Sequence, residues 1–196
     1  MSNSGEQGRD LERIARNIHP GGWAVESDRP IATLLGSCVS VCLFEPKLQL
    51  GGLNHFMLPK NTRGKDSDFD VLLCGDYAME VLANALYERG AQKKRLVAKA
   101  FGGGDIVANI TMSIGARNAE FAREWLAREG IPLVSSHFGG PYSRKLIFNP
   151  ATGDVFCKLV PNTLSASQSV AREEADYART LTTTPPPGKE KRIELF

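Results

Sequence analysis

Cys38 and His55 are the two residues of this sequence whose types and spacing can do chemistry together. Cys38 follows Gly36 and Ser37, which interrupt an otherwise apolar segment, and His55 ends the next apolar segment along the chain. An imidazole beside a thiol can take its proton, and the thiolate then attacks carbonyl carbons. The pair is therefore a candidate for cysteine-dependent acyl chemistry.

The residues next to this pair indicate how a substrate carbonyl is held. Gly36 has no side chain to obstruct a substrate, and the backbone amides of Gly36, Ser37 and Cys38 are candidate oxyanion donors. Asn54 precedes the histidine and is a candidate for orienting its imidazole or for contacting substrate.

The two segments that carry the pair are predicted to be neighbouring strands. Residues 31–44 and 48–58 are rich in apolar and β-branched side chains, as strands are. A turn centred just after Pro46 places Cys38 directly opposite His55, with Cβ atoms about 4.5–5.5 Å apart. Two glycines in the second segment can introduce a bulge, so the sequence predicts proximity rather than a distance.

A structural role is the ordinary alternative for both residues. A cysteine in an apolar strand is usually a small core residue, and a histidine at a strand end is usually structural. The other cysteines and histidines give weaker signals: Cys42 is expected in the core, Cys74 and Cys157 have no histidine nearby in sequence, His19 is expected in solvent, and His137 is expected to be structural. The residues alone leave both interpretations of the pair open.

The composition is that of one globular domain. Of the 196 residues 42% are hydrophobic, and the net charge of +2 gives no reason to expect nucleic acid or an anionic membrane as a partner. The first residues lack a signal-peptide pattern and no apolar run is long enough to span a membrane, so a cytoplasmic protein is expected. The four cysteines lack a Cys-x-x-Cys spacing, and no metal is expected.

The rest of the chain supplies the elements that must position the pair. Helices are predicted over residues 76–89 and 119–129 (the second capped by Asn118), strands over 96–101 and 131–138, and a hairpin over 143–149 and 154–160. The glycine run after residue 101 lacks the Gly-Lys-Ser/Thr of phosphate loops and is predicted to be a tight turn that approaches the site. A polar extension (1–22), a domain (23–160) and a C-terminal helix with a mobile tail (161–196) are expected.

Four segments resemble, in the same order, the CheD family of chemoreceptor glutamine deamidases. They are Thr33–Leu43, Gly51–Pro59, Lys99–Gly103 and Ile114–Asn118. The resemblance covers about residues 23–160. It implies an α/β (α+β) fold, a single-domain sandwich of mixed, largely antiparallel sheets with helices packed on one side, similar to toxin-type cysteine deamidases.

The resemblance also implies a reaction. Cys38 would attack the carboxamide of a receptor glutamine with help from His55, and water would hydrolyse the thioester to glutamate, without metal or organic cofactor. Family members carry a threonine upstream of the cysteine. Ala32 stands at the expected position, so Thr33 is the candidate for the third catalytic member. The implied partners are the cytoplasmic domains of methyl-accepting chemoreceptors and, for some members, a CheC-type phosphatase.

Two other functions fit the same residues. A non-catalytic chemotaxis adaptor would bind receptors or a CheC-type phosphatase, and its binding would survive the loss of Cys38. A different thiol amidase or peptidase would act on small amides or peptides but not on receptor glutamines.

Overall fold

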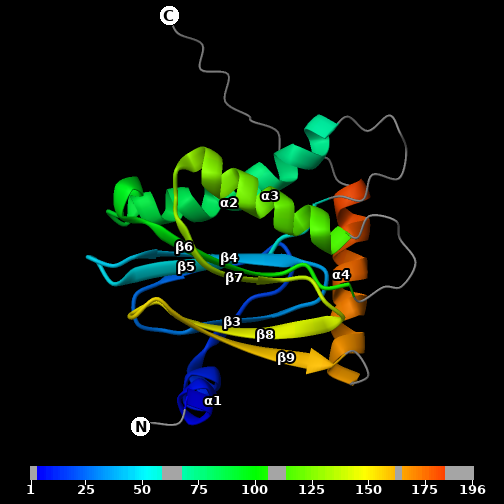
Figure 1. Ribbon diagram of the computed structural model, residues 1–196, viewed down its shortest axis with the longest axis horizontal. Coiled ribbons are helices and arrows are strands. Elements are labelled where there is room, and N and C mark those ends of the chain that lie inside the picture. Colours follow the sequence, from blue (N-terminus) through cyan, green and yellow to red (C-terminus); the bar gives the residue numbers. More distant parts are fainter. Residues whose placement is uncertain (1–3, 59–67, 106–113, 162–164, 184–196) are drawn as a thin grey trace, which may run out of the picture.

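Two mixed β-sheets stacked face to face form the body of the protein (Figure 1). The computed structural model describes residues 4–58, 68–105, 114–161 and 165–183. The four-stranded sheet consists, in spatial order, of β1 (Arg16–Asn17), β3 (Ile31–Leu35), β8 (Tyr142–Asn149) and β9 (Asp154–Pro161). The five-stranded sheet consists of β2 (Trp23–Glu26), β5 (Leu50–Asn54), β4 (Val39–Glu45), β6 (Val97–Gly102) and β7 (Leu133–Phe138). Only the β1–β3 and β6–β7 pairs of these strands are parallel, which confirms the predicted sandwich of largely antiparallel sheets.

The described residues form helices on three sides of this sandwich. They are α1 (Ser4–Ile14), α2 (Asp68–Glu88), α3 (Ile114–Glu129) and α4 (Ser165–Thr183), with a 3-10 turn at Lys93–Arg95. As expected, α2 and α3 share one side, on the outer face of the five-stranded sheet, whereas α1 lies on the outer side of the other sheet and α4 stands across one end of both (Figure 1). Among the described helices, none is long and apolar enough to cross a membrane.

The central strand β4 is buried on both faces. Its Cys42 packs with Ile31, Leu53 and Phe148 in the layer between the two sheets. Its Leu43 packs in the layer under α2 and α3. A strand that is covered on both sides is apolar nearly throughout, as this one is in sequence. The predicted core role of Cys42 is confirmed.

The hairpin of β4 and β5 has a different register from the predicted one. Cys42 pairs with Leu53, so the turn is centred one residue later than predicted, and Gln49 in this turn adopts a φ of 50°. The prediction that Cys38 lies directly opposite His55 is therefore wrong by two residues. Because side chains alternate with a period of two, this shift still leaves both on the same face.

Helix starts differ most from the predicted boundaries. The two central helices begin at Asp68 and Ile114, earlier than the predicted residues 76 and 119. Asn118 therefore lies inside α3, fully buried, and the predicted cap at this residue is wrong. Gly90 and Gly130 follow the two helices with φ values of 91° and 68°, as expected for C-terminal glycines.

The segments predicted to flank the domain contact the sandwich. Within residues 1–22, β1 pairs with β3. The amphipathic helix expected in the C-terminal segment is α4. The predicted mobile tail falls on residues 184–196, which lie outside the described residues.

Candidate active site

The structure brings the predicted cysteine and histidine together. Cys38 lies in the short connection between β3 and β4, and His55 directly follows β5. The Cys38 sulfur, a ring nitrogen of His55 and a carboxylate oxygen of Glu174 lie within 4.8 Å of one another. All three residues are buried.

The backbone of His55 is fixed by the N-terminal segment. The amide of Gly21 donates to the carbonyl oxygen of His55 at 2.8 Å, and the amide of His55 donates to the carbonyl oxygen of Gly22 at 2.9 Å. Residues before the first strand of the predicted domain thus help to place the imidazole.

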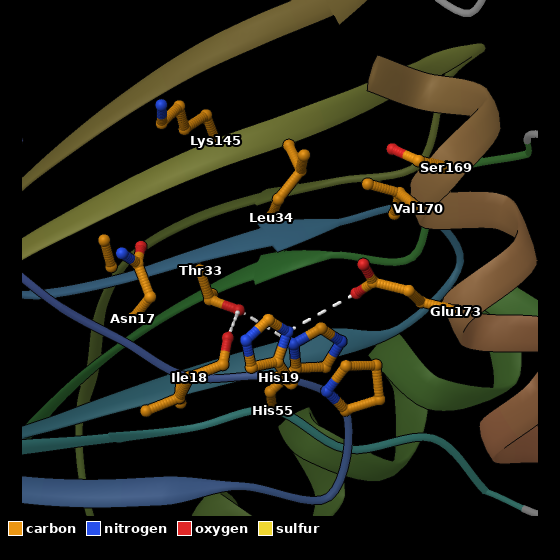
Figure 2. A pocket seen from close by; sticks show the side chains of 12 residues that line it. Asn17, Ile18, His19, Thr33, Leu34, His55, Lys145, Ser169, Val170 and Glu173 are labelled. Atoms are coloured by element: carbon orange, nitrogen blue, oxygen red, sulfur yellow. Dashed lines mark hydrogen bonds and ion pairs between the residues drawn. The ribbon is translucent and has the colours of Figure 1, made fainter. Parts of the chain in front are cut away.

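Thr33 fixes the tautomer of this imidazole (Figure 2). Its hydroxyl donates to the carbonyl oxygen of Ile18 at 2.9 Å and lies 2.8 Å from Nδ1 of His55. A hydroxyl has one hydrogen, so Thr33 must accept from Nδ1–H. The other ring nitrogen, Nε2, therefore carries the lone pair, and it has no hydrogen-bond partner among the described residues. This is the form that a general base requires.

Strand alternation explains why Thr33, and not its neighbour, reaches the histidine. Ala32 points to the outer side of the four-stranded sheet, where it packs with Ala15 and Ile147. Thr33 points the opposite way, toward His55. The structure thus places the third residue of the predicted set beside the second.

The predicted oxyanion donors converge on one carboxylate. The backbone amides of Gly36, Ser37 and Cys38 donate to the carboxylate of Glu174 at 2.7, 2.7 and 3.1 Å. The hydroxyl of Ser37 donates to the same carboxylate at 2.8 Å. Consecutive amides that point to one place form an anion-binding nest. We call these three amides the amide nest.

The carbonyl groups of the same three residues are also held by hydrogen bonds. They accept hydrogen bonds as follows: Gly36 from the amide of Gly104 at 2.8 Å, Ser37 from Nδ2 of Asn118 at 2.9 Å, and Cys38 from the amide of Gly103 at 2.8 Å. The Gly36 and Ser37 carbonyls share peptide units with the amides of Ser37 and Cys38, so these hydrogen bonds fix both peptide planes with their amides toward Glu174.

The glycine run that begins at the last residue of β6 reaches the site, as the sequence predicted. A Cβ atom on Gly102 would lie 2.2 Å from the carbonyl oxygen of Cys38, and the φ of this glycine is 120°. No residue with a side chain fits there without moving the nucleophile, because both the space and the backbone conformation require glycine.

Asn118 is a positioning residue that the sequence reasoning missed. Its Oδ1 accepts from the amide of Leu58 at 2.9 Å, while its Nδ2 holds Ser37. It therefore ties the segment after His55 to the segment before Cys38. The sequence signal for this role is an asparagine on the buried face of a helix, because a buried polar side chain needs hydrogen-bond partners.

Asn54 does not take part in the site. Its Oδ1 accepts from the amide of Val41 at 2.9 Å, and its Nδ2 donates to the carbonyl oxygen of Ala78 and the sulfur of Met79 at 3.0 and 3.3 Å. The prediction that it orients the imidazole or contacts substrate is wrong. Adjacent strand residues point to opposite faces, so Asn54 faces α2 while His55 faces the other sheet.

The electrostatics of the site are those of an uncharged pair. Burial raises the pKa of the Cys38 thiol well above its ordinary value, and the charge of Glu174 and a hydrogen bond to it raise it further. Burial, with a smaller effect of His19, lowers the pKa of His55 to about 3. At neutral pH both the thiol and the imidazole are therefore neutral in this arrangement.

Other polar groups near the site have partners of their own. The exposed His19 lies 3.4 Å from Glu173, as Figure 2 shows. His137 accepts from Nε of the buried Arg144 at 2.9 Å, which agrees with the structural role expected of it.

A cavity of about 200 Å³ lies between α4 and β3, and Thr33 and His55 form part of its wall.

Cys38, His55 and Glu174 are residue types that also bind zinc. However, Oε1 of Glu174 accepts from the amides of Gly36 and Cys38, and Oε2 accepts from the amide and hydroxyl of Ser37. A carboxylate that is satisfied in this way is an anion bound by amides, not a ligand directed at a cation.

The fold and the site together define a class of protein. An α/β sandwich holds a thiol, an imidazole with its lone pair available and an amide nest around one point, which is the equipment of enzymes that act on carbonyl groups. The chain belongs to the CheD family. Its residues 57–159 match the family described as "CheD chemotactic sensory transduction".

Curated relatives align with nearly the whole chain. The chain is 58% identical to "Probable chemoreceptor glutamine deamidase CheD 2" of Dechloromonas aromatica, over 96% of both chains. It is 42% identical to the protein of the same name in Burkholderia thailandensis, over 88% of this chain and 91% of the relative. It is 40% identical to "Probable chemoreceptor glutamine deamidase CheD" of Xanthomonas campestris pv. campestris, over 95% and 91%.

Among solved structures, the Bacillus licheniformis hypothetical protein YfiH has a TM-score of 0.39 and 14% identity, over 59% of this chain and 49% of that one. This similarity is too low to support an argument. The resemblance to toxin deamidases stays a prediction.

Proposed function

We propose that this protein converts glutamine side chains of chemoreceptors to glutamate, with Cys38 as the nucleophile. The observation that carries the proposal is the constellation of Cys38, His55 and Thr33, in which the imidazole has its basic nitrogen unpaired beside the thiol. The names of the curated relatives support the choice of substrate.

The proposed reaction has two halves. In the first, Nε2 of His55 takes the thiol proton of Cys38, and the thiolate attacks Cδ of the glutamine while the amide nest holds the oxygen. The C–N bond breaks, His55 returns the proton to the leaving ammonia, and a thioester remains. In the second, His55 deprotonates a water molecule, which attacks the thioester. The C–S bond breaks, the Cys38 sulfur takes the proton back from His55, and glutamate leaves.

The proposed partners follow from the substrate. The enzyme acts in the cytoplasm on the cytoplasmic domains of methyl-accepting chemoreceptors, with no organic cofactor or metal. A CheC-type phosphatase is a second proposed partner. The adaptor function is the competing proposal, because a binding protein can use the same surface without turnover.

A receptor deamidation assay tests the proposal. Purified protein is incubated with a receptor cytoplasmic fragment, and ammonia release and the conversion of glutamine to glutamate are measured by mass spectrometry. We expect conversion by the wild type and by Cys157→Ala, which removes an exposed thiol, and none by Cys38→Ala. Binding without ammonia release would favour the adaptor, and turnover of small amides alone would favour another thiol amidase.

Thr33 offers a second expected result in the same assay. Thr33→Val keeps the shape of the side chain but leaves the buried Nδ1–H of His55 without an acceptor. This hydrogen bond strengthens when His55 becomes protonated during the reaction, so its loss costs about 1–3 kcal/mol in the transition state and we expect kcat to fall by about tenfold or more. Thr33→Ser retains the hydroxyl and should keep kcat near the wild-type value. A normal kcat in Thr33→Val together with a loss in Thr33→Ser would show that the methyl group, and not the hydrogen bond, matters.

A further inference from the structure

Two carboxylates are buried among the described residues, and they are stabilised in different ways. Glu45 is paired with Arg95 through hydrogen bonds of 2.7 and 3.0 Å. This is the ordinary solution for a buried charge, which needs a counter-ion or many hydrogen bonds. Glu174, with 2% of its surface exposed, is instead held by the amide nest and the Ser37 hydroxyl.

The carboxylate of Glu174 lies where the carboxylate of the product would lie after the proposed reaction. Its side chain is that of glutamate, the product of glutamine deamidation. Its carboxylate lies in the amide nest, within 4.8 Å of the reactive atoms of Cys38 and His55. A product glutamate would make the same contacts.

We propose that Glu174 is a built-in mimic of the product, and that α4 occupies the binding surface of the helix that carries the target glutamine. This inference rests on the proposed function. A substrate helix therefore binds by displacing α4, and the protein is inhibited by its own C-terminal helix until this happens.

The packing of α4 fits an element that can leave. One face of the helix carries Val170, Glu174, Tyr177 and Leu181, which are spaced so that they lie on the same side. Only Val170 and Glu174 are buried among its described side chains, while Tyr177 and Leu181 pack partly against the cluster that contains Cys38. Of the described apolar side chains of α4 only Val170 is buried, so the Glu174 carboxylate is a main anchor of the helix.

The same face describes the partner. It fits an α-helix that presents glutamine at the place of Glu174, with apolar side chains four residues before it and three and seven residues after it. Because α4 stands across the end of both sheets (Figure 1), its departure opens the amide nest without disturbing either sheet.

The electrostatics of the nucleophile agree with an inhibited state. The charge of Glu174 and its hydrogen bond to the thiol add to the effect of burial, and all three raise the pKa of Cys38. A neutral glutamine in the same place brings no such charge, so the thiolate forms more readily once substrate has replaced α4.

The Glu174→Gln variant makes the mimic a substrate. The carboxamide at position 174 would lie beside Cys38, whose thiolate attacks Cδ. The C–N bond breaks, ammonia leaves with a proton from His55, and water hydrolyses the thioester, so position 174 returns to glutamate. Peptide mass spectrometry detects the replacement of NH2 by OH. We expect near-complete conversion in this variant and none when Cys38→Ala is added.

Glu173→Gln is the matched control for this experiment. Glu173 is the preceding residue of α4, but its side chain extends toward His19 (Figure 2). We expect its replacement to remain glutamine. If position 174 also remains glutamine while the same protein deamidates the receptor fragment, the product-mimic proposal fails and the proposed function stands. If neither the glutamine at position 174 nor the glutamine of the receptor fragment is converted, the proposed function fails as well.

Receptor kinetics of the full chain give a second test. Glu174→Ala removes the competing carboxylate, so we expect KM for the receptor fragment to fall by about tenfold, as it does when a binding-competent state becomes more populated. Asp176→Ala removes an exposed acid of the same helix that pairs with Arg179 and should leave KM unchanged. An increase in KM, or no change, in Glu174→Ala would overturn the proposal.

Discussion

Cys38→Ala, His55→Ala and the double variant are expected to show the same residual deamidation rate, at least about 10³-fold below that of the wild type. The imidazole contributes to the reaction by moving a proton to and from the thiol, so each residue has no catalytic use without the other. Free-energy losses of residues that act as one unit do not add. The measurement is kcat/KM on a receptor fragment for the three variants.

Cys42→Ala is the control for these variants. It removes a second buried thiol, which packs in the layer between the sheets and has no imidazole beside it. We expect this variant to lose about 1 kcal/mol of stability and to keep its turnover. A double variant of Cys38 and His55 that is much slower than either single variant would contradict the proposed pairing, because independent contributions would then add.

The meeting of Cys38 and His55 could be predicted from the sequence, but their exact placement could not. Apolar strands on both sides of a proline turn indicate a hairpin, and the residues that carry the pair lie at its open end. The register depends on the conformation of the turn, where Gln49 adopts a left-handed φ of 50°. A residue type that seldom adopts this conformation gives no signal for it.

Thr33 and Asn54 show where local reasoning succeeds and where it fails. Both are polar residues in predicted strands near the pair, and either could be assigned to the imidazole of His55. Which of them faces it depends on how the two sheets stack, and a strand pattern says nothing of this. The structure turns Thr33 toward His55 and turns Asn54 toward α2.

Glu174 and Asn118 lie beyond what spacing can predict. They reach the Cys38 connection from helices far away in the sequence. The amphipathic pattern predicted α4, and a charged residue on its apolar face is a signal that something must satisfy that charge. The identity of the partner follows only from the tertiary fold, because the amide nest has no side-chain signature.

Removal of the carboxylate at position 174 is expected to make Cys38 more reactive at neutral pH. The sign follows from the causes of its pKa shift: burial, the charge of Glu174 and the hydrogen bond to it all favour the protonated thiol. Glu174→Ala abolishes the last two and admits water. We expect the midpoint of the pH dependence of Cys38 alkylation to move to lower pH by a unit or more, which raises the thiolate fraction at pH 7 by about tenfold.

Iodoacetamide alkylation followed by peptide mass spectrometry measures this midpoint for each cysteine separately. The exposed Cys157 serves as a reference thiol within the same molecule, and its midpoint should not move. Asp176→Ala removes an equal charge from the exposed face of α4, so it controls for the loss of negative charge as such. If the midpoint of Cys38 stays constant or rises in Glu174→Ala, the carboxylate does not restrain the nucleophile. The proposal that α4 inhibits the enzyme through this carboxylate would then be wrong.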